Sequence, residues 1–289
     1  MALSPAQRIE AFHLVFLQVF VTGSRRERCI LKGGTNLRYF FNSVRYSNDI
    51  DLDVDAPANW QLEQAVDAAL SSSPLVKTLQ AAGIAIEPGS VSKPKQTPTT
   101  HRWRLGLIEP GVRGSEAART TIEFSSLEDG SGDHKFAAVP AAVVRPYGVL
   151  APTVAHYRLG AALEQKVAAL AERSQTKARD VFDLDLLFRL YAREATPPPL
   201  SAPKAELAAE RGLALTDDDF EVQVVPFLDP DVAELYAGRW TTMREEVAEH
   251  LIELVPTDAT EPATEPGLFD LTTLPSPPDS APDQPGRRS

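Results

Sequence analysis

Three aspartates alternate with apolar residues in the stretch DIDLDV, which spans residues 49–54. Strict alternation predicts a β-strand, and residues two apart in a strand share one face, so Asp49, Asp51 and Asp53 should point the same way. Like charges placed together repel one another, and burial increases that cost. A divalent cation such as Mg²⁺ would remove the repulsion, since it prefers carboxylate oxygens and leaves positions open for substrate phosphates. A solvent-facing acidic strand remains the alternative for this stretch taken alone.

A glycine turn lies shortly before the acidic strand. Gly33 and Gly34 end the predicted strand RCILKGG, and Thr35 can cap the helix predicted in TNLRYFFN. The N-terminus of a helix offers free N–H groups and the positive end of its dipole to a phosphate, and glycine lets the backbone come close. The stretch is not a Walker A motif, because no Gly-Lys-Ser/Thr follows at the required spacing. The turn and the strand together predict a phosphate cradle beside a metal site, to which Ser47 can add a hydroxyl.

A second group of charged residues lies on two predicted helices, LEQKVAALAER and ARDVFDLDLL. Lys166 and Arg173 are seven residues apart, hence on one side of the first helix, while Asp180 and Asp183 are three apart on the second. Carboxylates beside an apolar face need partners, and Lys166, Arg173 or Arg179 could supply charge-assisted hydrogen bonds. One interpretation is a helix pair tied by salt bridges, and the other is a group that serves a substrate.

The rest of the chain must supply the elements that hold these residues. Helical spacing of apolar residues predicts helices over 5–22 and 59–82, and from about residue 153 the pattern stays helical, with later helices near 203–213 and 230–254. Four further stretches are predicted as strands: IAIEP, THRWRLGLI, RTTIEFSS and VVRPYGVL. This order predicts an α+β fold, in which a small mixed sheet flanked by helices is followed by a helical bundle.

We expect three parts along the chain: an α/β core with its N-terminal helix over 1–152, a helical domain over 153–254 that completes the site, and a largely disordered, Pro-rich acidic tail over 255–289. Net charge follows this division. Residues 201–289 hold 19 acidic and 6 basic side chains, whereas residues 1–200 hold 21 acidic and 23 basic ones. Basic clusters in the first 200 residues could therefore hold phosphates, although the whole chain carries a net charge of −11.

Composition excludes several classes of protein. Hydrophobic residues make up 43% of the chain, but no apolar run reaches 18 residues, so we expect no membrane span. The single Cys29 excludes an intramolecular disulfide and a Cys-based zinc site, which fits a reducing cytoplasm. The three tryptophans are interpreted as core or interface residues. Trp103, which lies between Arg102 and Arg104, is the one to test for contact with RNA.

The Gly-Gly-Thr turn, its helix and the Ser-x-Asp-Ile-Asp strand resemble the core signature of the nucleotidyltransferase superfamily typified by DNA polymerase beta. The form LKGGTNLRYFF…RYSNDIDLDV is similar to the AbiEii/MenT-like toxins of bacterial type IV toxin–antitoxin systems, as is the pattern of charges on the two helices. In that fold an aspartate pair, here Asp49 and Asp51, binds two magnesium ions. A third acid often comes from a neighbouring strand, and Glu123 in RTTIEFSS is the candidate here, while Asp53 is treated as accessory.

The resemblance implies a magnesium-dependent nucleotidyltransferase toxin that moves a nucleoside monophosphate from an NTP to RNA, most plausibly the tRNA 3′ end, and so blocks translation. It implies catalytic roles for Asp49, Asp51, Lys166 and Asp183. It implies nucleotide binding by a larger set: Gly33, Gly34, Thr35, Ser47, Lys166, Arg173, Arg179 and Asp180. It also implies a cognate antitoxin encoded nearby. Two alternatives stay open, namely an enzyme of this fold that modifies an antibiotic or a protein hydroxyl, and a non-catalytic binding or regulatory module.

Overall fold

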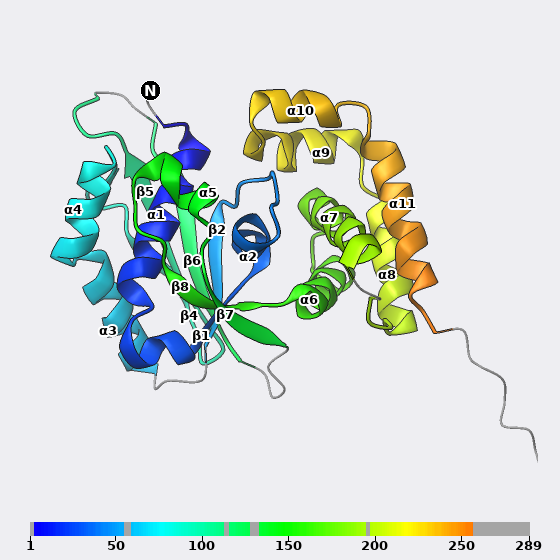
Figure 1. Ribbon diagram of the computed structural model, residues 1–289, viewed down its shortest axis with the longest axis horizontal. Helices are drawn as coiled ribbons and strands as arrows, with labels where there is room; N and C mark the ends of the chain where they lie inside the picture. Colours follow the sequence, from blue (N-terminus) through cyan, green and yellow to red (C-terminus); the bar gives the residue numbers. More distant parts are fainter. Residues whose placement is uncertain (1–2, 55–58, 113–115, 128–132, 195–196, 257–289) are drawn as a thin grey trace, which may run out of the picture. The chain divides into compact units, whose positions relative to one another are not determined.

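An eight-stranded mixed β-sheet carries the acidic strand near its middle, with helices on both faces (Figure 1). The computed structural model describes residues 3–54, 59–112, 116–127, 133–194 and 197–256, and the chain up to Pro256 forms one unit. The strand order is β3-β5-β6-β2-β1-β8-β7, and β4 also pairs with β5. The strands are β1 Cys29–Lys32, β2 Asp49–Val54, β3 Ala85–Ile86, β4 Ser92–Gln96, β5 Thr100–Ile108, β6 Ala118–Ser126, β7 His134–Ala138 and β8 Thr153–Tyr157.

Alternation along the central strands separates an apolar face of the sheet from a charged one. Ile50 and Leu52 of β2 and Phe124 of β6 are fully buried in one core cluster with Phe16 of α1. Three helices cover this face: α1 Pro5–Phe20, α3 Asn59–Leu70 and α4 Ser73–Ala81. The first of them begins with a capping box formed by Ser4 and its third helical residue. Because this face is apolar, the residues between the buried ones point to the opposite side of the sheet.

The opposite face is approached by α2 Gly33–Phe40, which contacts β2, and by a group of helices with its own core. In this group α6 contacts both α2 and α7, and α8 and α11 complete the packing. The helices are α6 Leu159–Glu172, α7 Ala178–Glu194, α8 Ala202–Leu213, α9 Asp217–Gln223, α10 Pro230–Tyr236 and α11 Trp240–Glu253. The predicted α+β class is therefore confirmed, with a mixed sheet followed by helices.

Two of the predicted elements are wrong. The stretch VVRPYGVL is not a strand: it ends the short helix α5 Ala141–Val144 and continues as a 3₁₀ turn over Arg145–Tyr147. Its proline lacks the N–H that a sheet needs, and Gly148 has a φ of 63°, which ends the turn. Residues 153–157 are not helical, because their β-branched and aromatic side chains form β8 between β1 and β7.

Other predicted boundaries shift. The helix predicted over 59–82 is two helices, since Ser72 caps the second with its side chain. The helix predicted over 230–254 is also two, and Gly238, with a φ of 74°, lies between them. Strands β4 and β7 and helix α9 have no counterpart in the predicted set. The predicted tail lies, from residue 257 on, outside the described residues.

Candidate active site

Strand pairing places charged residues from four strands in one row on the charged face. Asp51 of β2 is opposite Lys32 of β1 on one side and Glu123 of β6 on the other. Glu123 is in turn opposite Arg102 of β5. Residues directly opposite in a sheet point to the same side, so all four side chains share this face. Asp49 lies two residues from Asp51 on the same face, beside β6.

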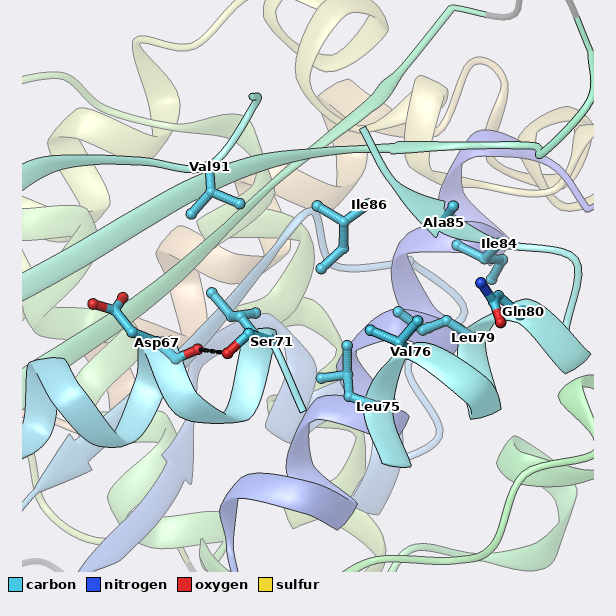
Figure 2. A pocket seen from close by; sticks show the side chains of 11 residues that line it. Asp67, Ser71, Leu75, Val76, Leu79, Gln80, Ile84, Ala85, Ile86 and Val91 are labelled. Atoms are coloured by element: carbon cyan, nitrogen blue, oxygen red, sulfur yellow. Dashed lines mark hydrogen bonds between the residues drawn. The ribbon is translucent and has the colours of Figure 1, made fainter. Parts of the chain in front are cut away.

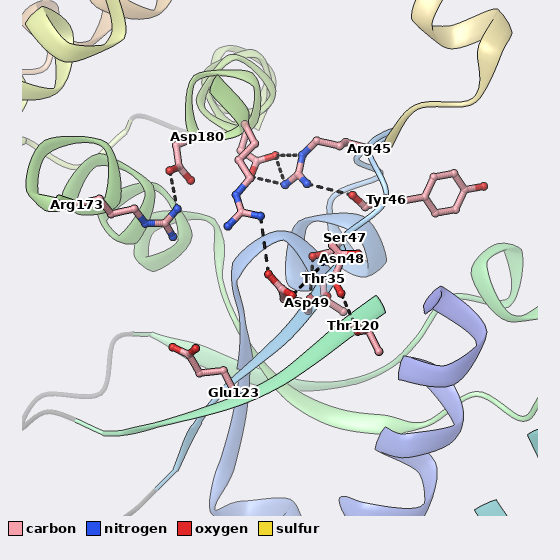
Figure 3. Close-up of polar contacts among 12 residues, drawn as sticks. Thr35, Arg45, Tyr46, Ser47, Asn48, Asp49, Thr120, Glu123, Arg173 and Asp180 are labelled. Carbon is pink, nitrogen blue, oxygen red and sulfur yellow. Dashed lines mark hydrogen bonds and ion pairs between the residues drawn. The ribbon is translucent and has the colours of Figure 1, made fainter. Parts of the chain in front are cut away.

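Except for Lys32, these residues form one wall of a cavity of about 680 Å³, a size typical of small-molecule sites. The other wall is the segment that joins α6 to α7. The cavity therefore brings together three acids of the sheet, Asp49, Asp51 and Glu123, and five cations, Arg102, Arg104, Arg173, Lys177 and Arg179. Figure 3 shows Glu123 on the sheet side and Arg173 on the helix side of this space. The residues that line this cavity thus include five of the predicted site residues.

A second cavity, of about 430 Å³, lies on the other side of the molecule's central sheet between α3, α4 and β3 (Figure 2). Its lining is mainly aliphatic, with Leu75, Leu79, Ile84 and Ile86, and includes one carboxylate, Asp67. None of the predicted site residues contributes to it. Its lining supplies neither paired acids nor cations, so we do not place the chemistry there.

The carboxyl group of Asp51 lies in an unfavourable electrostatic environment. Burial, and then the neighbouring charge of Asp49, raise the pKa of Asp51 to about 6, although Lys32 and Arg179 act in the opposite direction. The guanidinium of Arg179 approaches Asp49 Oδ2 at 3.9 Å. A bound cation would relieve this repulsion, so the two carboxylates fit a magnesium ion whose remaining positions are left to substrate oxygens.

The other two acids of the sheet are already paired. Glu123 accepts a hydrogen bond from Arg102 Nε at 2.6 Å. Asp53 accepts hydrogen bonds from Lys32 Nζ at 2.6 Å and from the Tyr157 hydroxyl at 2.7 Å. Within the described ranges no three His, Cys, Asp or Glu residues are arranged as a metal site. The structure therefore leaves Asp49 and Asp51 as the pair of acids available to a metal.

Neighbouring side chains come so close to the two positions of the turn that only glycine fits there. Gly33 has a φ of +68°, and a Cβ there would lie 2.6 Å from Asp51 Oδ2. A Cβ on Gly34 would lie 2.8 Å from both Arg45 Nη2 and Ser47 Oγ. The cradle predicted from the sequence is thus packed directly against the acidic strand.

Thr35 does not cap helix α2. The helix begins at Gly33, its N-cap is Lys32, and no side chain caps it, so the N–H groups of its first turn are left without that partner. The Thr35 hydroxyl is buried and instead donates to the carbonyl of Asp49 at 2.8 Å, and Ser47 Oγ donates to the same carbonyl at 2.8 Å. Figure 3 shows both hydroxyls beside Asp49. These two residues hold the start of the acidic strand.

A buried chain of alternating charges joins the loop before β2 to the cavity. Arg45 donates to Asp183 through Nε at 3.1 Å and Nη2 at 2.9 and 2.8 Å. Lys166 lies 2.6 Å from Asp183 and 3.0 Å from Asp180, and Asp180 accepts from Arg173 Nη1 at 2.9 Å. Of these residues, only Arg173 lines the cavity. Lys166 is therefore held by Asp180 and Asp183 and does not line the cavity. It acts on the cavity indirectly, because Asp180 also pairs with Arg173.

The ion pairs of Asp183 outweigh the effect of its burial. Burial alone would raise the pKa of Asp183, but Arg45 and Lys166 lower it to about 2. Sequence reasoning missed Arg45, because its partner lies 138 residues away and a single arginine in a loop has no periodicity to reveal it.

A second positioning network was also missed. Thr120 Oγ1 donates to the carbonyl of Asn48 at 2.7 Å, and the Nε2 of His13 lies 2.8 Å from the same hydroxyl. Since the hydroxyl proton is used on Asn48, His13 acts as the donor. Burial lowers the pKa of His13 to about 3, so its ring is neutral at physiological pH. Helix α1 thereby supports the backbone that carries Asp49.

Trp103 belongs to the core, as one interpretation of the sequence had it. Its side chain is fully buried, and its Nε1 donates to Asp67 Oδ1 at 3.2 Å. The hypothesis that it contacts RNA is therefore wrong. Alternation puts Arg102 and Arg104 on the charged face and Trp103 on the apolar one.

A strand with two closely placed aspartates, a glycine turn packed against it and a cation-lined cavity are the fold and site of a nucleotidyltransferase. The family model described as "Nucleotidyl transferase AbiEii toxin, Type IV TA system" matches residues 15–263. The chain therefore belongs to the AbiEii nucleotidyltransferase toxin family of type IV toxin–antitoxin systems, and it is an enzyme of that class. Membership implies an NTP substrate and an antitoxin partner.

Solved structures share the fold at low sequence identity. A crystal structure assigned as a nucleotidyltransferase from H. pylori aligns with a TM-score of 0.52 and 16% identity, covering 88% of this chain and 99% of that one. JHP933 from Helicobacter pylori aligns with a TM-score of 0.51 and 17% identity, covering 88% and 96%. MenT4, a nucleotidyltransferase toxin from Mycobacterium tuberculosis H37Rv, aligns with a TM-score of 0.49 and 16% identity, covering 87% of this chain and 94% of that one.

No curated protein matches this chain. Among the helices that the structure describes, none has the length and apolar character needed to span a membrane.

Proposed function

We propose that this enzyme transfers a nucleoside monophosphate from an NTP to RNA, at the 3′ end of tRNA, in a magnesium-dependent reaction that releases pyrophosphate. The observation that carries the proposal is the pairing of Asp49 and Asp51 on one face of β2, opposite a wall of cations in the same cavity. Such an arrangement can bind a metal and a triphosphate side by side. An acceptor on tRNA would account for toxicity, because a tRNA altered at its 3′ end does not support translation.

Asp49 and Asp51 would hold magnesium, since burial and the neighbouring charge of Asp49 raise the pKa of Asp51, and a bound cation would offset both effects. When bound, the metal favours the deprotonated attacking hydroxyl and neutralises charge on the phosphates. Glu123 is a further candidate ligand, on condition that Arg102 releases it, because its carboxylate accepts a hydrogen bond from that arginine at 2.6 Å. Arg102 would then be available to the substrate.

Residues of the helical wall would bind the triphosphate. Arg173, Lys177 and Arg179 face the acids across the cavity, where positive charge stabilises phosphate oxygens as charge develops on them. Lys166 contributes by holding Asp180, which orients Arg173. Asp183 fixes Lys166 and Arg45 together. The N–H groups at the start of α2, which no side chain caps, would offer further donors to phosphate.

The proposal is tested with purified protein, Mg²⁺ and each of the four NTPs labelled at the α-phosphate, together with total tRNA. We expect label on the RNA 3′ end with wild type and none with Asp49→Asn or after addition of EDTA. Asp218→Asn is the matched control, because Asp218 is an exposed residue of α9 far along the sequence from the cavity-lining residues. Label that appears only on an antibiotic or on protein would refute the RNA acceptor and support the same chemistry on a different substrate.

A further inference from the structure

Four of the five cations in the cavity already have a partner, and one does not. Arg102 pairs with Glu123, Arg173 with Asp180, and Arg179 approaches Asp49. Lys177 donates to the neutral amide of Gln175. Arg104 is exposed, and its side chain makes no hydrogen bond or ion pair with any described residue. A cation that no acid in the described part of the chain neutralises is available to an external anion.

The charged face continues from Arg104 to the edge strand β4. Lys95 is opposite Arg102 in the register of β4 and β5, so its side chain lies on the same face as the cavity. It is exposed, and it too forms no ion pair with any residue in the described ranges. Two residues beyond Arg104, Gly106 places no side chain on this face, and the ion pair of Arg119 with Glu87, at 3.0 Å, lies over it. Arg104 and Lys95 therefore form a strip of unpaired cations that runs from the cavity to the edge strand β4.

The strip contains no aromatic side chain that could stack on a base. Trp103 and Phe124 point to the apolar face and are fully buried. A partner bound here would consequently be recognised through its charge, which is how proteins contact nucleic-acid backbones independently of sequence.

We propose that Arg104 and Lys95 bind the phosphate backbone of the acceptor RNA and lead its end into the cavity. The inference rests on the proposed function and adds the surface and the mode of recognition. The NTP has its own cations on the helical wall, and a small uncharged acceptor would need none outside the cavity. An extended polyanion is the acceptor that uses charges placed in a line from the cavity to the sheet edge.

Lys93 offers a matched control on the same strand. It is ion-paired with Glu63 at 2.8 Å and with Asp67 at 2.6 Å, so its charge is neutralised by the protein. Replacing it by glutamine removes one positive charge from β4, as does Lys95→Gln, but it removes no cation from the strip. A difference in RNA affinity between Lys95→Gln and Lys93→Gln therefore reports the loss of a cation from the strip and not the change in net charge.

The test measures tRNA affinity of the full chain as a function of salt concentration, in EDTA so that no transfer occurs. For each phosphate that a variant no longer binds, the slope of log K against log salt should fall by about 0.7 for a single strand, which corresponds to about fourfold weaker binding at 0.15 M salt. We expect this from Arg104→Gln and from Lys95→Gln, about 15-fold from both together, and no change in slope from Lys93→Gln. NTP affinity should stay within twofold in all three variants.

The outcomes separate this inference from the proposed function. If wild type labels tRNA and binds it, but both strip variants bind with the slope of Lys93→Gln, the strip is refuted and the function stands. If wild type neither binds tRNA nor labels it, both are refuted. If Arg104→Gln weakens NTP binding and leaves the RNA slope unchanged, Arg104 belongs to the nucleotide site and the strip is again refuted.

Discussion

Replacing Arg45 by methionine should destabilise the fold strongly, although this residue lies in a loop. Its side chain is 3% exposed and its partner Asp183 is fully buried. The substitution removes three hydrogen bonds to that carboxylate and one to the carbonyl of Tyr46. Loss of one member of a buried pair costs about 3–5 kcal/mol, because the other charge stays buried. Lys166 remains 2.6 Å from Asp183, so we expect the lower end, about 3 kcal/mol.

The assay is urea unfolding at pH 7, with the exposed Arg26→Met as the control, which should change the free energy of unfolding by less than about 0.5 kcal/mol. A double-mutant cycle with Asp183→Leu isolates the pair. Because the two substitutions disrupt the same interaction, the double variant should be destabilised by clearly less than the sum of the single variants, with a coupling energy of at least about 1–2 kcal/mol. A loss below about 1 kcal/mol in Arg45→Met, or strict additivity in the cycle, would refute the reasoning.

Lowering the pH should reduce the destabilisation caused by Arg45→Met, and the direction of this change follows from the pKa of Asp183. The folded-state value of about 2 is below the ordinary 3.8, so pairing adds stability above pH 4 that is lost as the pH falls towards 2. The difference corresponds to about 2 kcal/mol. Without Arg45 the pKa of Asp183 moves back towards its ordinary value. The gap in stability between wild type and Arg45→Met should therefore narrow below pH 4, and a gap that widens there would contradict the assignment.

Three further substitutions test the site itself. Asp51→Asn should abolish transfer yet stabilise the protein in EDTA, because a pKa raised from 3.8 to about 6 costs stability that grows above pH 3.8 and reaches about 3 kcal/mol above pH 6; thermal unfolding at pH 4 and pH 8 shows whether the gain is clearly larger at the higher pH. Gly33→Ala should lower both stability and activity more than Gly89→Ala, because the two have φ values of +68° and +74° but only the first Cβ would meet an atom, Asp51 Oδ2; equal effects would exclude the clash. Thr120→Val should cost about 1–3 kcal/mol and reduce kcat, because the carbonyl of Asn48 loses its donor; Thr120→Ser should restore most of both.

Local pattern predicts the parts of the site that depend on neighbours in sequence. Alternation in residues 49–54 places Ile50 in the core and the aspartates on the other face, which the structure confirms. The same reasoning identifies β6, in which the structure sets Glu123 beside Asp51. Both results need only the period of two in a strand.

Pairing across the chain is beyond such reasoning. The partners of Asp183 are on a loop and a helix, and nothing in the spacing distinguishes Arg45 from any exposed arginine. The residues of β8 are predicted as helix because TVAHY continues into a helical pattern, and only the place of this strand between β1 and β7 decides its conformation. Edge strand β4 is polar throughout, so it lacks the alternation that identifies a half-buried strand.

The positions of Asp49 and Asp51 are determined by contacts that come from four elements, α2, β6, α1 and α7. The carbonyl of Asp49 accepts hydroxyl hydrogen bonds from Thr35 of α2 and from Ser47, and the preceding carbonyl accepts one from Thr120 of β6. His13 of α1 supports that last contact, and Arg45 ties the same loop to α7. Like charges on neighbouring positions would separate if the backbone were free to move. The enzyme therefore maintains the repulsion between its two aspartates by fixing the main chain on which they stand, and a metal with its substrate can relieve that repulsion without any rearrangement of the strand.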